Sequence, residues 1–249
     1  MEFNQIVGNG NAVRTLQKAS NGGPLNHAYL LHGTKGTGKR TLARIFAEGI
    51  FCRGEEHPCG SCSACLKVEK GIHPDLMVVQ KPEGKANILV EQVRFLREQV
   101  YVRPNESRHR VIIIEESESM NLSAANALLK VLEEPPSYVV FILTANNISA
   151  LPETIVSRCL CLEMQEVSLH QAEKWLLSRY PDGEAGMLEN ALSYGNGNLG
   201  RSSAYMEEES CREGFQRALS VARSLTTERE YDILEALSPF DGDKEGFLQ

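Results

Sequence analysis

The stretch GTKGTGKRT, residues 33–41, indicates the fold of this chain. It follows the short apolar run HAYLLHG and precedes the amphipathic stretch TLARIFAEGIF, so a strand, a glycine-rich loop and a helix come in succession. In this context the pattern G-x-x-x-x-G-K-[ST] forms a phosphate-binding loop. The chain departs from the pattern at the last position, where Arg40 replaces the hydroxyl residue. We therefore expect a phosphate-binding loop whose metal site is altered.

The glycines of this loop let the backbone turn around phosphate groups with its N–H groups pointing inward, and the lysine would reach the outer phosphates. Thr41 does not replace the missing hydroxyl, because the next helical residue points about 100° away. Arg40 could neutralise phosphate, which permits nucleotide binding and hinders hydrolysis. A loop that merely connects a strand to a helix is the alternative. The candidate nucleotide-binding residues here are Gly33, Gly36, Gly38, Lys39, Arg40 and Thr41.

A phosphate site of this kind also needs acidic residues at the end of a neighbouring strand. The run VIIIEE supplies Glu115 and Glu116, with glutamate at 115 where aspartate is usual. The extra methylene moves the carboxylate by about 1 Å, which disturbs the octahedral geometry that Mg²⁺ requires. Glu116 stands where a water-polarising base would be, and Asn146, after FILTA, could orient water or phosphate. A charge pair that starts a helix is the plainer interpretation of the glutamates.

Four cysteines, Cys52, Cys59, Cys62 and Cys65, follow the spacing C-x6-C-x2-C-x2-C. Two overlapping C-x2-C steps present thiolates to one tetrahedral ion, and the first cysteine can supply the fourth ligand. Four thiolates leave no position for a substrate, so the spacing predicts a structural Zn²⁺. A redox pair and an iron–sulfur cluster are the alternatives.

Continuous apolar runs alternate with helical patterns up to about residue 165, for example VIIIEE, ANALLKVLEEPP and YVVFILTANN. This alternation predicts an α/β core with a parallel sheet covered on both faces. From residue 166 the pattern is wholly helical, and residues 166–249 carry 8 Lys and Arg against 16 Asp and Glu. The net negative charge of the chain therefore lies after residue 165, and the core is nearly neutral. We expect the core to bind phosphates more readily than the acidic remainder.

No apolar run approaches the roughly 18 residues that span a membrane, and the first residues lack a signal-peptide profile. We therefore expect a cytoplasmic protein without a membrane partner. The segment LPETIVSRC ends the core and contains Arg158. From the sequence alone, this arginine is most simply a surface charge or one half of an internal salt bridge.

Taken together, these motifs resemble those of the bacterial clamp-loader subunits, AAA+ proteins of the DNA polymerase III holoenzyme. The resemblance rests on the phosphate loop, the cysteine cluster, HPDL, VEQVRFLREQV, ANALLKVLEEPP, LPETIVSRC and GNGNLGRS, and it covers at least residues 5–205. HPDL, the double glutamate and the damaged loop look most like the delta-prime branch. The gamma/tau branch would be expected to keep G-K-[ST] and D-E.

The resemblance implies a pentameric ring in which gamma/tau ATPases work with delta and delta-prime to load the sliding clamp onto primer-template DNA. A delta-prime-type subunit is there a stator that hydrolyses little or no ATP itself. Its S-R-C arginine enters the ATP site of a neighbour, which makes Arg158 the expected arginine finger in trans. Binding of ATP or ADP would be weak and the Mg²⁺ site impaired. The lid arginine of family ATPases is also displaced, since Gly200 stands in its place and Arg201 follows.

The resemblance also implies three domains: an AAA+ core over residues 1–165 with the zinc module at 52–65, a helical lid over 166–207, and a collar beginning at 208. Residues 208–249 are too few for a complete collar, so we expect a truncated or naturally short chain. Two rival functions stay open. One is an active gamma/tau-type ATPase, and the other is a stand-alone zinc-bearing nucleotide-binding module outside replication.

Overall fold

A computed structural model describes residues 2–227. The chain divides into two compact units, residues 1–167 and 168–249. The first unit is built on a five-stranded parallel sheet in the order β2-β3-β4-β1-β5, which confirms the predicted parallel sheet. Its strands are β1 (Ala28–His32), β2 (Leu76–Val79), β3 (Arg110–Ile114), β4 (Val139–Ala145) and β5 (Leu160–Glu163).

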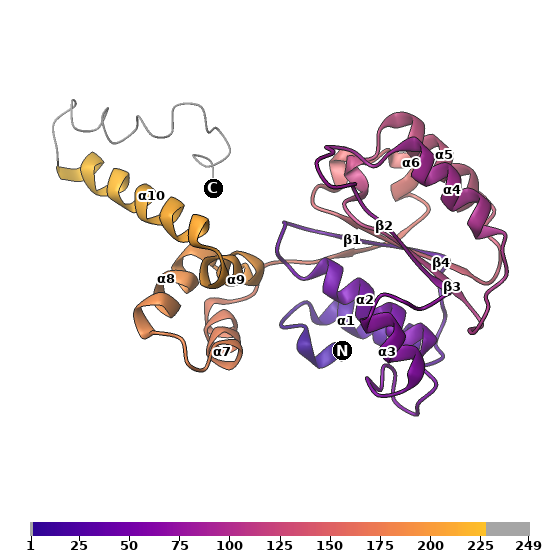
Figure 1. Cartoon of the computed structure of the whole chain (residues 1–249), viewed down its shortest axis with the longest axis horizontal. Coiled ribbons are helices and arrows are strands. Elements are labelled where there is room, and N and C mark those ends of the chain that lie inside the picture. The colour runs from indigo at the N-terminus through magenta and orange to yellow at the C-terminus, as the bar shows by residue number, and fades with distance from the viewer. Residues whose placement is uncertain (1, 228–249) are drawn as a thin grey trace. The chain divides into compact units, whose positions relative to one another are not determined.

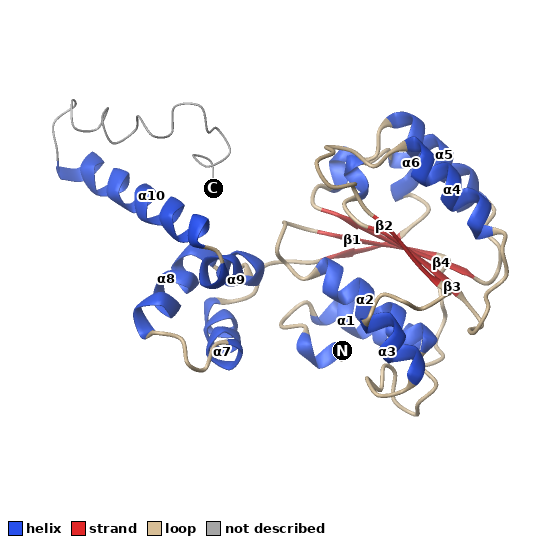
Figure 2. Ribbon diagram, viewed as in Figure 1, coloured by secondary structure: helices blue, strands red, loops and turns tan. Residues whose placement is uncertain are grey.

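Helices cover both faces of this sheet (Figure 1, Figure 2). One face carries α1 (Gly10–Ser20), α2 (Lys39–Phe51) and α3 (Ser63–Glu69), and the other carries α4 (Val90–Val100), α5 (Leu122–Glu133) and α6 (Glu153–Val156). Short 3-10 turns are η1 (Phe3–Gln5), η2 (Ser117–Ser119) and η3 (Ile148–Ala150).

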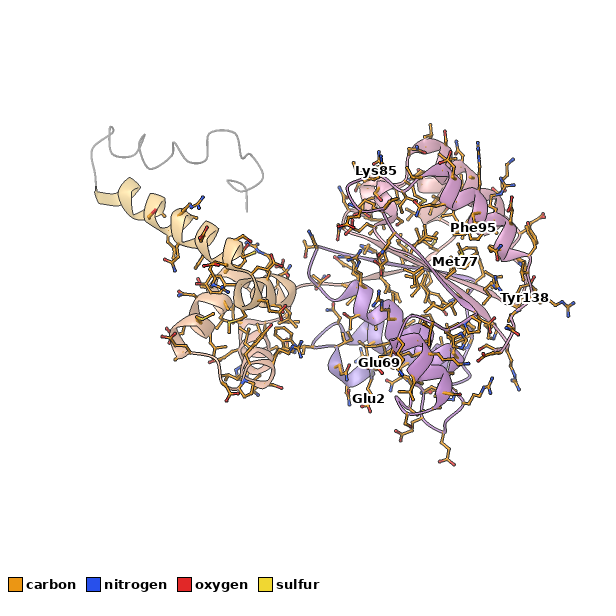
Figure 3. The ribbon with its side chains drawn as sticks, in the orientation of Figure 1. Glu2, Glu69, Met77, Lys85, Phe95 and Tyr138 are labelled. Carbon is orange, nitrogen blue, oxygen red and sulfur yellow. The ribbon has the colours of Figure 1, made fainter. Side chains whose placement is uncertain are left out.

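Two hydrophobic cores form because successive residues of a strand point to opposite faces. In β3, Val111 and Ile113 join the core under α1 and α2, whereas Ile112 and Ile114 join the core under α4 and α5. All four are fully buried. The uninterrupted apolar run of β3 is thus required by burial on both sides, and side chains fill the layers between the sheet and its helices (Figure 3).

The HPDL segment, residues 73–76, forms hydrogen bonds with the loop that leads into β3. Asp75 is buried, and its carboxylate accepts hydrogen bonds from the backbone N–H groups of Asn105 (2.5 Å), Glu106 (2.8 Å) and Ser107 (2.9 Å). Burial alone would raise the pKa of Asp75, but these three donors hold it below its usual range. His73 supports the turn, since its Nδ1 accepts from the Asp75 N–H at 3.2 Å.

Within residues 168–227, the second unit consists of helices packed around aromatic side chains. Tyr194, Tyr205 and Phe215 contact one another with ring centroids 5.3–5.7 Å apart. Gly195 permits the close packing of two helices, because a Cβ there would lie 1.9 Å from the Ser202 hydroxyl oxygen. The helices are α7 (Leu169–Arg179), α8 (Ala185–Gly195), α9 (Leu199–Glu207) and α10 (Glu209–Thr227).

Some elements are absent from the sequence-based expectations. The short strand β5 and the helices α3, α6 and α9 have too few residues to show a clear period, and only the structure reveals them. The expected collar segment, residues 208–249, is described as far as Thr227, where α10 ends, and its remainder lies outside the described residues. None of the helices in the described part of the chain is long and apolar enough to cross a membrane.

We predict that Asp75→Asn destabilises the first unit by about 1–3 kcal/mol at pH 7, because an amide cannot accept all three backbone hydrogen bonds. A carboxyl with a depressed folded pKa stabilises the fold above its unfolded pKa of about 3.9, and this contribution disappears as the pH falls through the folded pKa. The difference between the two proteins should therefore shrink below about pH 4. Urea unfolding between pH 3 and pH 7 measures it. The control is Asp182→Asn, at an exposed site, and equal losses for both variants would contradict the prediction.

Candidate nucleotide and metal sites

The phosphate loop leaves β1 at the carboxyl edge of the sheet and enters α2. Gly33 must be glycine, because a Cβ there would lie 1.9 Å from the carbonyl oxygen of Met164, just after β5. Gly33, Gly36 and Gly38 all have positive φ, at 145°, 91° and 88°, as a loop folded around a phosphate requires. The loop therefore has the backbone conformation that the sequence predicts.

Lys39 lies on the inside of this loop. Its ammonium group donates hydrogen bonds to the carbonyl oxygens of Gly33 and Thr34, both at 2.6 Å, and only 6% of the residue is exposed. Burial lowers the pKa of Lys39 to about 8, against the opposing effect of the Glu118 and Glu116 carboxylates. The lysine is still mostly protonated at pH 7, so the loop keeps a positive charge suited to phosphate.

Arg40 is paired with Glu115. Its Nη2 lies 2.6 Å from Glu115 Oε2, and the Glu115 side chain is only 2% exposed. Arg44, one turn further along α2, places its Nη2 3.7 Å from the other carboxylate oxygen. These are the two positions that would supply protein ligands to Mg²⁺, and here they neutralise each other. The residues present do not fit a Mg²⁺ site, because the ion would have to displace a guanidinium from the same carboxylate.

Glu116 and Asn146 meet at the same edge. Glu116 has a left-handed backbone (φ 50°), and its N–H donates to the Thr144 hydroxyl at 3.1 Å. Lys81 lies 2.6 Å from the Glu116 carboxylate and lowers its pKa. The Asn146 N–H donates to Glu118 Oε1 at 2.9 Å. Glu116 and Asn146 thus both lie at the carboxyl edge of the sheet, where the phosphate loop begins. The Glu116 carboxylate is already paired with the Lys81 ammonium group.

The four cysteines converge, as their spacing predicts. The sulfur atoms of Cys52, Cys59, Cys62 and Cys65 all lie within 4.8 Å of one another. A tetrahedral ion with Zn–S bonds of about 2.3 Å needs sulfur–sulfur separations of about 3.8 Å, so the cluster fits one ion after small movements. Cys52 directly follows α2, and Cys62 and Cys65 flank the start of α3. The cluster can therefore hold one metal ion between the two helices.

Backbone N–H groups surround these sulfurs. The N–H groups of Gly54 and Cys59 each donate to Cys52 Sγ at 3.3 Å, and the Cys62 N–H donates to Cys59 Sγ at 3.4 Å. Donors from Ser61 and Cys62 lower the pKa of the Cys59 thiol to about 5, whereas burial raises that of Cys65. The N–H donors favour thiolates, the form that binds metal.

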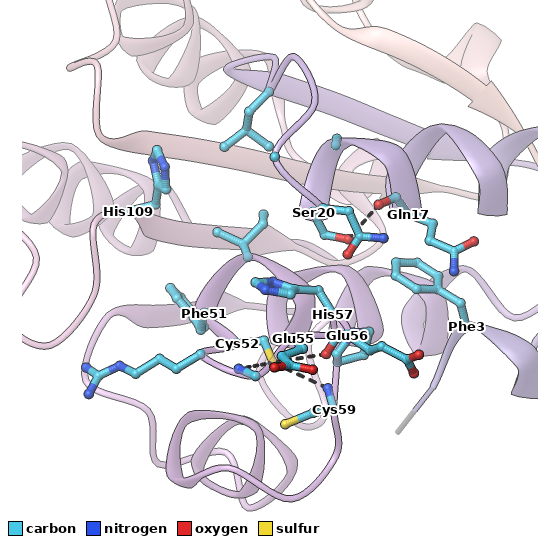
Figure 4. A pocket seen from close by; sticks show the side chains of 18 of the residues that line it. Phe3, Gln17, Ser20, Phe51, Cys52, Glu55, Glu56, His57, Cys59 and His109 are labelled. Carbon is cyan, nitrogen blue, oxygen red and sulfur yellow. Dashed lines mark hydrogen bonds between the residues drawn. The ribbon is translucent and has the colours of Figure 1, made fainter.

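A polar pocket of about 1280 Å³ opens beside the cysteine cluster (Figure 4). Cys52, Cys59 and His57 line it, together with the end of α1 and residues 106–109. It lies at the carboxyl end of α2, roughly 20 Å along the helix from the phosphate loop. The pocket is therefore distinct from the nucleotide site.

Arg158 lies between α6 and β5, at the amino edge of the sheet. Its Nη2 is 2.8 Å from Glu133 Oε1, and its Nη1 donates to the Thr154 carbonyl at 2.8 Å. Leu160, two residues later, pairs with Tyr29 near the start of β1, whereas the phosphate loop begins where β1 ends. The length of β1, roughly 17 Å, separates Arg158 from its own loop. The structure thus contains the salt bridge that the plainer interpretation proposed.

Several partners at these sites escaped the sequence analysis. Arg44 could have been found, because it follows Arg40 by one helical turn and shares its face. The other three partners could not have been found, because each is 25 or more residues away in the sequence and no local pattern links the two. These are Lys81 for Glu116, Glu118 for Asn146, and Glu133 for Arg158. In the second unit, Arg201 stacks on the Tyr194 ring, with its guanidinium carbon 4.9 Å from the ring centroid.

Solved structures share this architecture. The Thermotoga maritima RuvB Holliday junction branch migration motor aligns over 98% of this chain and 74% of its own, with a TM-score of 0.56 and 17% identity. A DNA polymerase III gamma subunit-related protein from Thermotoga maritima aligns over 91% of this chain and 76% of its own, with a TM-score of 0.51 and 19% identity. At these identities the likeness shows the fold, which is the P-loop AAA+ fold expected above.

Curated relatives are more similar in sequence. The delta' subunit of DNA polymerase III from Pseudomonas aeruginosa is 38% identical over 69% of this chain and 53% of its own length. The gamma subunit from Buchnera aphidicola (Acyrthosiphon pisum) is 35% identical over 70% and 48%, and the tau subunit from Bacillus subtilis 33% over 79% and 36%. The chain spans about half or less of the length of these relatives.

A family model described as "DNA polymerase III, delta subunit" matches residues 8–168. With its P-loop core, its four-cysteine cluster and this match, the chain belongs to the DNA polymerase III delta subunit family.

Proposed function

We propose that this protein is a delta-prime-type subunit of the bacterial clamp loader, a stator that assists ATP hydrolysis by a neighbour and performs little itself. The observation that carries the proposal is the Arg40–Glu115 ion pair. A buried carboxylate that is already neutralised by a guanidinium is a poor ligand for Mg²⁺. Phosphoryl transfer from ATP depends on that ion to neutralise developing charge. The loop can hold a nucleotide weakly through its N–H groups and Lys39, without efficient turnover.

Arg158 supplies the other half of the proposal. An arginine finger stabilises the charge that develops on a transferring phosphoryl group. Its position at the amino edge of the sheet supports action on a neighbouring subunit, because its own phosphate loop is a strand length away. The partners are gamma/tau and delta subunits, and through them the sliding clamp and primer-template DNA in the cytoplasm. Residues 1–165 would form the core, 166–207 the lid and 208 onward the start of a collar.

An active gamma/tau-type ATPase is the second candidate. The gamma and tau relatives from Buchnera aphidicola and Bacillus subtilis match this chain at 35% and 33% identity, and Lys39 is correctly held in its loop. The Arg40–Glu115 pair and the stacking of Arg201 on Tyr194 weigh against this candidate. Purified protein that turns over ATP at the rate of ordinary clamp-loader ATPases would favour it.

We predict that Arg40→Thr with Glu115→Asp strengthens Mg²⁺-dependent nucleotide binding roughly tenfold or more, or about 1.4 kcal/mol. The double change restores a hydroxyl and a shorter carboxylate and removes the competing guanidinium. Calorimetric titration of ADP with and without Mg²⁺ measures the effect. Arg44→Thr is the matched control, because Arg44 lies 3.7 Å from the same carboxylate but outside the loop motif. No gain from Mg²⁺ in the double variant would count against the proposed defect.

We predict that Arg158→Ala lowers DNA- and clamp-stimulated ATP hydrolysis by the reconstituted loader while folding and metal content stay unchanged. An arginine finger supplied by another protein raises the rate of GTP hydrolysis by roughly 10³ to 10⁵ in GTPases. Only the one ATP site that Arg158 completes would be affected, so total turnover should fall partly. Arg158→Lys should rescue poorly, since an ammonium lacks the planar fork. Arg103→Ala, at another exposed arginine of the first unit, is the control. If loaders that contain Arg158→Ala hydrolyse ATP at the unmodified rate, Arg158 is only a surface charge.

We propose that the cysteine cluster binds one structural Zn²⁺, and we predict one zinc per chain by elemental analysis of protein purified without chelators. Structural zinc contributes on the order of 10 kcal/mol to the folding of small modules, so Cys65→Ser should lose both the metal and local protease resistance. Cys211→Ser, outside the cluster, should keep both. Well under one zinc per chain would defeat the prediction, and iron with sulfide would assign an iron–sulfur cluster instead.

A further inference from the structure

Two acceptors of the same chain bind the Arg158 guanidinium. Glu133 Oε1 binds its Nη2 and the Thr154 carbonyl oxygen binds its Nη1, each at 2.8 Å. These contacts use two of the five N–H donors that an arginine carries. Among the described residues the remaining three have no hydrogen-bond partner, and about a third of the side chain is exposed. The group is therefore oriented and still able to bind another anion.

Both acceptors belong to helices of the core. Thr154 is in α6, which Pro152 precedes. Glu133 is the last residue of α5, and Pro135 and Pro136 prevent the helix from continuing. A carboxylate at a helix carboxyl end is electrostatically unfavourable, because the helix dipole is negative there. Glu133 occupies that position with Arg158 as its counter-ion, so the pair compensates an otherwise unfavourable charge.

We infer that Glu133 is a positioning residue for Arg158, an inference that rests on the proposed trans-acting function of this arginine. A long side chain loses rotamer freedom when it must meet a phosphoryl group, and a partner that already fixes it reduces that loss. Glu133 is half-exposed, so water screens the pair and the guanidinium can reach a phosphate with its other donors. Glu133 touches no reacting atom and acts through Arg158 alone.

The test uses the full-length chain reconstituted with the ATPase and delta subunits of its own organism. Glu133→Gln should lower the stimulated rate at the one ATP site that Arg158 completes by up to about fivefold, the range expected for losing one exposed ion pair. The total kcat should therefore fall less than in Arg158→Ala, with little change in KM. Glu133→Asp should recover part of the loss. Glu134→Gln, the next residue and equally acidic, is the matched control and should leave kcat unchanged. In an Arg158→Ala background, Glu133→Gln should cause no further loss.

A second measurement on the isolated chain separates positioning from simple stabilisation. The NMR order parameter of the Arg158 Nε–H should fall in Glu133→Gln and stay unchanged in Glu134→Gln. A lower melting temperature with unchanged kcat and order parameter would overturn the inference and leave an ordinary salt bridge. A raised kcat would also overturn it, since Glu133 would then hold the arginine back. If Arg158→Ala loses activity but Glu133→Gln does not, only the positioning role fails. If Arg158→Ala is fully active, the proposed function fails and the positioning role fails with it.

Discussion

Burial of the parallel sheet on both faces is the constraint on which the rest of this structure depends. Every residue of β3 and β4 is withdrawn from water, so these strands can carry apolar side chains almost exclusively. Polar chemistry is therefore confined to the strand ends. The carboxyl edge gathers the phosphate loop, Glu115 and Asn146, and the amino edge carries Arg158. These edges are a strand length apart, so Arg158 lies far from its own phosphate loop, as the proposed action on a neighbouring subunit requires.

Glu115 shows how an ion pair can replace a metal. A carboxylate that is 2% exposed must have a counter-charge, because its desolvation would otherwise cost several kcal/mol. In an active P-loop site Mg²⁺ serves this purpose, and here Arg40 does. Arginine at the end of the loop is therefore compatible with the fold, and under the proposed function it takes the place of the catalytic metal. Gly33, Gly38 and Lys39 keep the conformation of a phosphate-binding loop beside this ion pair.

Much of this was predictable from sequence because the strongest signals are local. The phosphate loop lies between a strand and a helix, and the cysteines are spaced by short turns, so both could be located from consecutive residues. The short strand β5 could not, since four residues with two exposed ones give no pattern. The partner of Arg158 could not either, because Glu133 reaches it through the packing of separate elements. The motif placed Glu115 at the same site as Arg40, but not as its ion-pair partner. Long-range pairing of charges depends on the tertiary fold, which no window of residues contains.

The ion pairs of the two arginines differ in the exposure of the carboxylate partner, which is 2% for Glu115 and 51% for Glu133. Arg40 is bound to a carboxylate that water barely reaches, and the low local polarity strengthens the pair until release becomes costly. Arg158 is bound to a carboxylate that is 51% exposed, where solvent screening leaves the pair worth roughly 1 kcal/mol or less. The Arg40 guanidinium is therefore the counter-charge that the buried Glu115 needs. The Arg158 guanidinium can exchange or share its partner at little cost, which is the property that an arginine presented to another subunit needs.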